Sequence, residues 1–277
     1  MGMKSRLKKE AKKRLDNLSK VERLVSGERN PLVGITIAIT KPEPRLFRGM
    51  GFITERLGKE LRLVATARHV LQPLLENSSS CVLRLGINPA RPTSMLLVGQ
   101  PIEDSDPETD IAFFLARDPT NAPTQPFSLK TEDAPSLRDT KGTLYNAQNC
   151  WSLLGPPYGA EVSRQSEVSE LGRAYCKLSL PHHTHAVPFD DLELQAKLRE
   201  EDWIECRLLQ MISRAAFSGS PVFDDELRLY GMTVRGTEPR SSNYERWGDA
   251  LVCLPTSQLF AARQRIDSRL QQLLCNL

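Results

Sequence analysis

The sequence predicts an all-β protein built from two antiparallel β-barrels, with helices only at its two ends. Its 277 residues are 40% hydrophobic and 26% charged, a composition typical of a globular chain with a sizeable core. Nineteen prolines and 16 glycines are spread along the chain, as expected where many short strands need many turns. The strand-like runs fall into two clusters separated by the proline-rich residues 117–142.

The first cluster, residues 31–120, predicts the first barrel. It opens with Val33, Ile35, Ile37 and Ile39, which alternate with small or polar residues and predict a half-buried strand. Five further strand-like runs follow at residues 51–54, 61–66, 81–85, 95–98 and 111–115. Residues 121–142 then predict a linker between the barrels.

The second cluster, residues 143–255, predicts the second barrel, with strands that include 203–209, 227–234 and 250–254. Residues 190–202 are rich in Glu, Lys, Gln and Leu and predict a helical insertion in this barrel, placed where it could act as a gate. The long loop 237–248 either contributes to substrate specificity or is a solvent-exposed loop without a role in binding. Residues 256–277 predict a C-terminal helix, with Thr256 or Ser257 as its N-cap.

Residues 1–30 predict a basic helical arm. Apolar residues recur at steps of three and four between positions 3 and 25, so they share one helix face. Residues 1–24 carry nine Lys or Arg and three acids, a charge of +6 in a chain of net +3, which leaves the remainder at −3. This nearly neutral body favours no nucleic-acid partner. The arm is either docked on the body or solvated, or residues 1–25 tether a regulatory protein partner or an anionic surface.

The chain also carries signals about its compartment. It has no run of about 18 apolar residues, so we expect no membrane span. The basic N-terminus is not followed by an apolar segment, which disfavours a secretory signal. The six cysteines form no CxxC pair, and we expect them to be reduced and mostly buried. We therefore predict an intracellular, cytoplasmic protein, unless the chain is the mature form of a secreted one.

Three residues have sequence contexts suited to catalysis. Ser218 precedes Gly219, which permits the unusual backbone angles of a tight turn that exposes a nucleophile, although a polar turn between strands is the alternative. His69 lies between a strand pattern and a short helix pattern, where a purely structural histidine is also common. Asp110 abuts the apolar run 111–115 and either orients an imidazole or caps a strand; Asp104 and Asp106 are its local competitors.

Together these contexts resemble the trypsin-like, chymotrypsin-fold serine peptidases over residues 31–255. The matching segments are Gly49-Met50-Gly51-Phe52-Ile53, Ala65-Thr66-Ala67-Arg68-His69-Val70, Asp110-Ile111-Ala112 and Phe217-Ser218-Gly219-Ser220-Pro221. The order His, Asp, Ser along the chain is the one found in that fold. The resemblance implies two six-stranded barrels, the first carrying His69 and Asp110 and the second carrying Ser218.

The resemblance also implies a role for each residue. Ser218 would attack the scissile carbonyl, His69 would transfer the proton, and Asp110 would orient His69. The backbone N–H groups of Ala216 and Ser218 would form the oxyanion hole. Substrate-binding positions would be Ile212, at the pocket floor, and the strand residues Thr233, Val234, Arg235 and Gly236.

Several positions depart from the family pattern. Phe217 replaces the Asp that commonly receives a new N-terminus after proteolytic activation, so we expect no activation by N-terminal trimming. Ala216 replaces a usual Gly, which predicts an oxyanion hole that is distorted at rest. Ile212 disfavours a preference for Lys or Arg; an apolar P1 residue is then expected, unless Arg214 and Arg235 select an acidic one.

The function expected from the sequence is a serine endopeptidase that cleaves a protein or peptide substrate without a cofactor or metal. The main alternative is a catalytically silent protein of the same fold that binds a partner, and a third is an esterase or an unrelated β-domain. His182, His183 and His185 match no strong zinc pattern, so a polar loop is expected there rather than a metal site.

Overall fold

The computed structural model describes most of the chain. The described residues are 21, 29–39, 44–76, 81–88, 91–104, 106, 109–150, 159–176, 184–187, 191–201, 203–212, 216–236 and 248–277. The basic arm therefore lies outside them except for Val21, Arg29 and Asn30, as do His182, His183, Arg214 and most of the loop 237–248. The side chain of His185 is also outside the described part.

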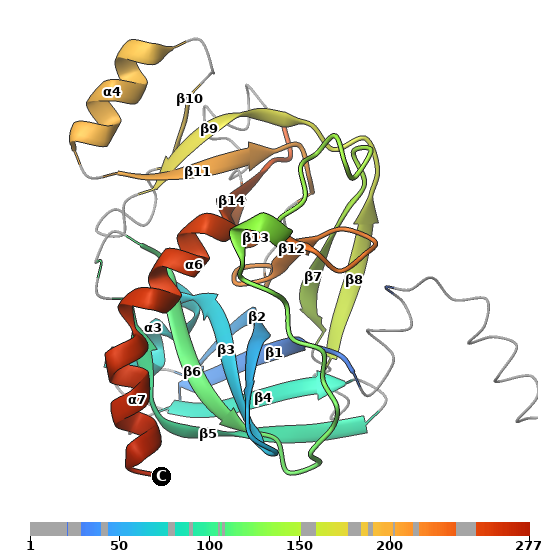
Figure 1. The fold of residues 1–277 in the computed structure, drawn as a ribbon, viewed down its shortest axis with the longest axis vertical. Coiled ribbons are helices and arrows are strands. Elements are labelled where there is room, and N and C mark those ends of the chain that lie inside the picture. The colour runs from blue at the N-terminus through green and yellow to red at the C-terminus, as the bar shows by residue number, and fades with distance from the viewer. Residues whose placement is uncertain are drawn as a thin grey trace, which may run out of the picture.

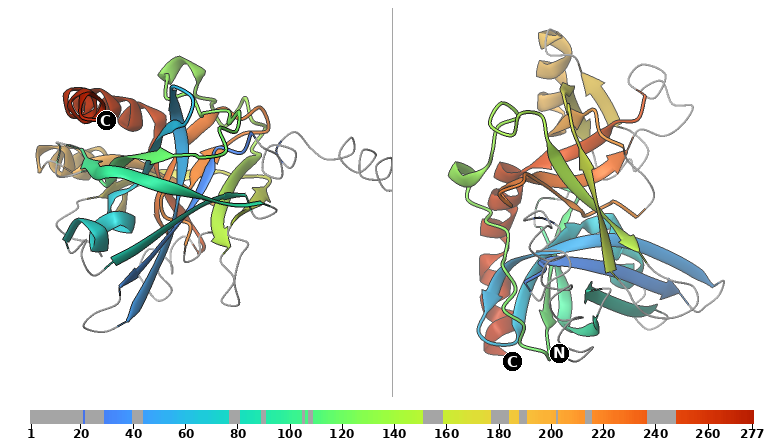
Figure 2. Two further views of the ribbon diagram at one scale, coloured as in Figure 1. Left: turned by 90° about the horizontal axis from the view of Figure 1, so that it is seen from below. Right: turned by 90° about the vertical axis from the view of Figure 1, so that its right-hand side faces the viewer.

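The first half of the chain forms a closed six-stranded antiparallel barrel (Figures 1 and 2). The strand order is β1-β2-β3-β6-β5-β4, and the barrel closes where β4 pairs with β1. The strands are β1 (Leu32–Ile39), β2 (Arg45–Leu57), β3 (Leu61–Ala67), β4 (Cys81–Asn88), β5 (Arg91–Glu103) and β6 (Ile111–Arg117). Each of the six strands expected from the sequence is present, and helix α3 (Arg68–Glu76) follows β3 directly.

Strand β1 is more buried than its alternating pattern predicted. Residues 32–37 are buried on both faces rather than on one. The physical reason is that the outer face of β1 lies against the second half of the chain. There Asn149 on β7 (Leu144–Cys150) donates a hydrogen bond through Nδ2 to the carbonyl of Ile35 at 2.8 Å. A strand at a barrel interface thus buries its small and polar residues as well.

The second half forms an eight-stranded antiparallel sheet in the order β10-β9-β11-β14-β13-β12-β7-β8. Besides β7, its strands are β8 (Gly159–Gln165), β9 (Glu170–Cys176), β10 (Thr184–Val187), β11 (Ile204–Leu209), β12 (Pro221–Phe223), β13 (Leu229–Gly236) and β14 (Leu251–Pro255). Helix α4 (Leu192–Glu200) lies within the insertion predicted at residues 190–202. The all-β fold class is confirmed, and the second half differs in detail from a simple six-stranded barrel.

The difference comes from one bent strand and one added strand. β8 and β9 lie near opposite ends of the sheet order, yet only residues 166–169 separate them in the chain (Figure 1). Residues 166–169 therefore connect two strands that lie near opposite ends of the sheet. β10 is an extra strand at the edge of β9. If β10 is set aside and β8 and β9 are counted as one bent strand, the eight strands reduce to six.

Aromatic side chains join the two halves. Phe127, from the segment between them, has its ring 5.7 Å from that of Phe52 and 5.1 Å from that of Phe223. The Phe223 ring in turn stacks on Tyr145 at 5.7 Å. All four side chains are buried. Because Phe52 belongs to the barrel and Phe223 to the sheet, this aromatic row forms a shared core that fixes the two halves together.

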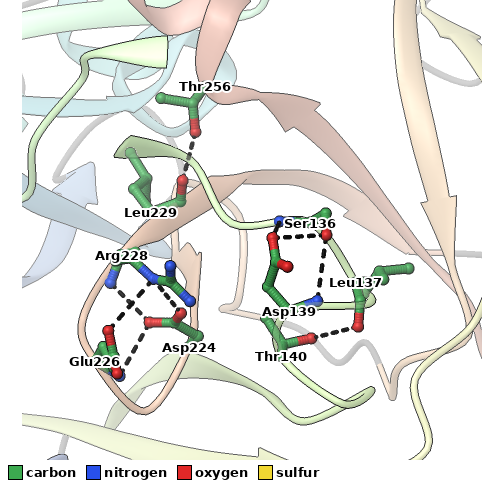
Figure 3. A network of polar contacts seen from close by, with 9 residues as sticks. All are labelled: Ser136, Leu137, Asp139, Thr140, Asp224, Glu226, Arg228, Leu229 and Thr256. Atoms are coloured by element: carbon green, nitrogen blue, oxygen red, sulfur yellow. Dashed lines mark hydrogen bonds and ion pairs between the residues drawn. The ribbon is translucent and has the colours of Figure 1, made fainter. Parts of the chain in front are cut away.

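Polar turns hold the sheet around β12 and β13 (Figure 3). Asp224 closes the hairpin between these strands, since its carboxylate accepts hydrogen bonds from the backbone N–H of Arg228 at 2.8 Å and from its Nε at 2.7 Å. In the same view, Thr256 donates its hydroxyl to the carbonyl of Leu229 on β13 at 2.7 Å. The hairpin that follows Ser218 is thus fixed at its far end.

The C-terminal segment forms two consecutive helices rather than the single one expected, α6 (Thr256–Arg265) and α7 (Asp267–Cys275). They meet at the buried Ile266, and together they extend along both halves of the molecule (Figure 1). α6 packs on β13 and β14 of the sheet, and α7 packs on β5 of the barrel. None of the helices in the described part is long and apolar enough to span a bilayer.

Candidate active site

His69 lies in the first turn of α3, immediately after strand β3. The strand end is fixed because Thr66 donates its hydroxyl to the carbonyl of Met50 at 2.6 Å. The His69 side chain is 32% exposed, so part of it is accessible to solvent. This corner is the position expected from the sequence pattern.

Asp110 contacts His69 through both carboxylate oxygens. Oδ2 lies 2.6 Å from His69 Nδ1, and Oδ1 accepts the backbone N–H of His69 at 3.0 Å. The Asp110 side chain is only 6% exposed. Because an ionised carboxylate can only accept, this contact favours the tautomer of neutral His69 that has its proton on Nδ1 and its lone pair on Nε2. Asp104, one of the local competitors, is instead paired with Arg265.

Ser218 lies on a tight turn between the two halves. Its carbonyl accepts the N–H of Met50 on β2 at 2.8 Å, and the next residue, Gly219, donates to the carbonyl of Thr233 on β13 at 2.8 Å. Gly219 has a φ of +80°, and a Cβ there would lie 2.5 Å from Oγ1 of Thr66, near the end of β3. The serine turn therefore abuts the strand end that leads into His69.

The hydroxyl of Ser218 is hydrogen-bonded to the backbone rather than to the imidazole. It donates to the carbonyl of Val234 at 3.3 Å, and within the described ranges His69 and Ser218 share no hydrogen bond. A hydrogen bond from Oγ to Nε2 would replace the one to the Val234 carbonyl. Long or misaligned catalytic hydrogen bonds are common in enzymes without a bound substrate.

The backbone before Ser218 adopts a left-handed conformation. Ala216 has a φ of +74°, which costs a residue with a Cβ about 1–2 kcal/mol. Its carbonyl accepts the N–H of Asn149 at 3.3 Å. The N–H groups of Ala216 and Ser218 donate to no acceptor in the part of the chain that the structure describes.

The positions expected to bind substrate are partly brought together. Strand β12 pairs with β13 only as far as Met232, so residues 234–236 have no strand neighbour on that side among the described residues. Thr233 and Val234 are buried, and Arg235 and Gly236 are half-buried. Ile212, expected at a pocket floor, has a 43% exposed side chain, and its N–H is bound to Gln165 Oε1 at 2.8 Å.

A cysteine pair lies near Asp110 and was not expected as part of the site. A hydrogen bond with Cys176 and complete burial raise the pKa of the Cys206 thiol well above its ordinary value, and the nearby charge of Asp110 adds to the shift. Cys206 therefore stays a neutral thiol. The five cysteines whose side chains the structure describes are all free. That part also holds no group of three His, Cys, Asp or Glu side chains able to bind a metal ion.

Comparisons with known proteins find similarity in structure. No protein-family model and no curated protein matches the chain. The Rv3671c protease from M. tuberculosis in its active form matches with a TM-score of 0.51 and 14% identity, over 89% of this chain and 83% of that one. Deg5 matches with a TM-score of 0.51 and 15% identity, over 87% of this chain and 91% of that one.

A third match has a lower score. The HtrA-type protease AlgW with a tripeptide is 18% identical, with a TM-score of 0.48. The match covers 90% of this chain but 62% of AlgW, so this chain spans less than two thirds of that protein's length. The closed barrel, the adjoining sheet and the first two matches agree on the architecture.

The chain has the chymotrypsin-like fold.

Within this chymotrypsin-like fold, two features of the site depend on tertiary packing that the sequence does not show. Asn149 holds the carbonyl of Ala216 through its backbone and reaches β1 through its side chain, but no motif surrounds it. Phe217, where an Asp is common, is buried with 3% exposure and so occupies an apolar environment. The sequence shows that Phe217 departs from the pattern, but the burial of its side chain depends on tertiary packing.

Proposed function

We propose that this protein is a serine endopeptidase, with Ser218 as nucleophile, His69 as general base and Asp110 as the residue that orients His69. The observation that carries the proposal is the double contact of Asp110 with His69, at Nδ1 and at the backbone N–H. It leaves Nε2 as the free base, directed by a buried carboxylate, in the first turn of α3 beside the serine turn.

The chemistry proceeds in two steps. Ser218 Oγ turns from the Val234 carbonyl towards Nε2, gives its proton to His69 and attacks the scissile carbonyl carbon. The resulting oxyanion accepts hydrogen bonds from the N–H groups of Ala216 and Ser218, which have no acceptor among the described residues. His69 then protonates the leaving amine, and a water molecule hydrolyses the acyl-enzyme by the reverse sequence.

The substrate would bind as an additional strand beside residues 234–236 of β13. The edge of β13 at residues 234–236 has no strand neighbour among the described residues on that side, which supports this mode because a peptide backbone can form a ladder there. Arg235 lies on this edge, and Arg214 is outside the described residues. A library of peptides that vary at P1 decides between an apolar and an acidic preference.

We propose further that N-terminal trimming does not activate the enzyme. β1 pairs with β2 over residues 32–39 and with β4 over residues 34–39, and residues 32–37 are buried. A new N-terminus near Val33 would therefore have to leave the barrel. The buried Phe217 side chain also offers no charge to receive an ammonium group. Activity that appears only after cleavage near Val33 would disprove this part of the proposal.

A fluorophosphonate probe tests the catalytic assignment. We expect the wild-type protein to be labelled, Ser218→Ala to lose the label, and Ser257→Ala, a change at an exposed serine, to keep it. Loss of a triad member lowers turnover by about 10⁴-fold or more in serine peptidases, so His69→Ala should be nearly inactive. Full peptidase activity in His69→Ala would refute the assignment.

One observation favours the alternative of a silent, partner-binding protein. The Ser218 hydroxyl is bound to Val234 rather than to His69, and the strained Ala216 stands where the family usually has glycine. A folded wild-type protein that resists the probe would support this alternative.

We also propose an intracellular location for this protein, and fractionation of the source cells tests it.

A further inference from the structure

The loop that precedes Asp110 is held by the last residue of helix α6. Arg265 donates Nε to Asp104 Oδ1 at 2.7 Å and Nη2 to Asp104 Oδ2 at 2.5 Å. The Asp104 side chain is 1% exposed and that of Arg265 is 32% exposed. A bidentate Arg–carboxylate pair with one buried partner fixes both position and orientation.

The Asp104 carboxylate also organises the loop from within. It accepts the hydroxyl of Thr109 at 2.5 Å and the N–H of Asp106 at 3.3 Å. Thr109 is completely buried and directly precedes Asp110. Burial alone would raise the pKa of Asp104, but the hydrogen bonds from Arg265 and Thr109 outweigh it and hold that pKa below its ordinary value. Asp104 is therefore ionised, and it links Arg265 to the residue beside Asp110.

The other end of α6 is attached to the second half of the molecule. Thr256, its first residue, donates to the carbonyl of Leu229 on β13, as seen in Figure 3. The same strand carries Val234, whose carbonyl accepts the Ser218 hydroxyl. Helix α6 thus runs from the strand beside Ser218 to the loop that carries Asp110.

We propose that Arg265 and Asp104 are positioning residues, which hold Asp110 in contact with His69 and connect this contact to the serine-bearing half through α6. The effect on turnover rests on the proposed peptidase function, whereas the effect on the His69–Asp110 contact does not. Because Asp110 contacts His69 at 2.6 Å and 3.0 Å, a small shift of the loop breaks this geometry. Misplacement of a catalytic group by about 1 Å can cost about 100-fold in rate.

The same helix offers a matched control. Arg263 donates Nε to Glu55 Oε1 at 2.5 Å and Nη2 to Glu55 Oε2 at 3.3 Å. This pair also joins α6 to the barrel, with side-chain exposures of 17% and 34%, but Glu55 lies on β2. Arg263→Met therefore removes a similar bond between the same helix and barrel without touching the Asp110 loop.

The experiment compares Arg265→Met with Arg263→Met in the full chain. The first measurement is the downfield proton NMR resonance of His69 Nδ1–H, which reports its hydrogen bond to Asp110 directly. The second is the rate of fluorophosphonate labelling, with turnover of a peptide substrate split into kcat and KM. We expect Arg265→Met to shift or broaden the resonance, and to lower the labelling rate and kcat by about 10- to 100-fold with KM nearly unchanged.

The control should keep both the resonance and the labelling rate of the wild type. If Arg265→Met does not fold, Arg265→Lys, which keeps the charge but loses the bidentate geometry, should give a smaller change in the same direction. Arg265 variants that match Arg263→Met in both measurements would overturn the proposal. If the wild type resists the probe, the peptidase assignment fails, and the NMR comparison still decides whether Arg265 positions Asp110.

Discussion

Replacement of Gly219 by alanine should destabilise the protein more than the same change at a turn where the new Cβ meets no neighbouring atom. Gly219 has a φ of +80°, so a Cβ there brings the strain of the left-handed region, about 1–2 kcal/mol. That Cβ would also lie 2.0 Å from the Met50 carbonyl oxygen and 3.0 Å from the Ala67 backbone nitrogen. These are backbone atoms of β2 and β3, which cannot move without disturbing the barrel.

The clash therefore adds to the strain. Overpacking of a well-filled site typically costs about 1–3 kcal/mol. We expect Gly219→Ala to lower the free energy of unfolding by about 2–5 kcal/mol in total, measured by urea denaturation with a spectroscopic probe. Since the turn carries Ser218, any relaxation that relieves the clash also moves this proposed nucleophile.

Gly58 provides the control. It has a φ of +83°, but no atom lies within 4 Å of a Cβ built there. Gly58→Ala thus carries the backbone strain without the clash, and should cost only about 1–2 kcal/mol. Equal losses for the two variants would refute the argument, because they would show that the contact of Gly219 with β2 and β3 contributes nothing.

Three other perturbations have defined outcomes. Phe127→Ala should lower the free energy of unfolding by about 3–5 kcal/mol, since its ring joins the cores of the two halves; a loss below about 1 kcal/mol by urea denaturation would contradict this. Arg62→Met should cost about 3–5 kcal/mol because it leaves Asp118 buried without a cation, and the double variant with Asp118→Ala should recover part of the loss in the same assay. The pKa of Asp104 is lowered in the folded state, so its contribution to stability is present above the unfolded value of about 3.9 and is lost as the pH falls through the folded value. Denaturation of wild type and Arg265→Met from pH 7 to pH 3 should therefore show a stability difference that shrinks at low pH, whereas a constant difference would argue against this linkage.

Local patterns in the sequence predicted much of the first half. The alternation around Ile35 and the apolar run 111–115 are properties of a few adjacent residues, and the strands formed where they predicted them. The corner at His69 and the turn at Gly219 are equally local, because each depends on the last residues of one strand and the few residues after them. The identity of these residues therefore predicted both the fold class and the candidate triad.

Patterns of this kind did not predict how the second half is arranged. β8 and β9 are consecutive in the chain but lie near opposite ends of the sheet order, and β10 is added at the edge of β9. Residues 166–169 contain no signal that distinguishes a bend from a hairpin. The outcome depends on which edges pair, and pairing of distant edges is decided by the packing of the whole sheet.

What the sequence by itself determined is the set of candidate catalytic residues, His69, Asp110 and Ser218, each in a suitable local context. Only the tertiary structure decided which of three acids contacts His69, where the Ser218 hydroxyl points and what holds the loop before Asp110. Asp104 and Arg265 are 161 positions apart, and Asn149 and Ile35 are 114 apart. Contacts at such separations arise only when the two halves pack around a shared core, so no local pattern can encode them.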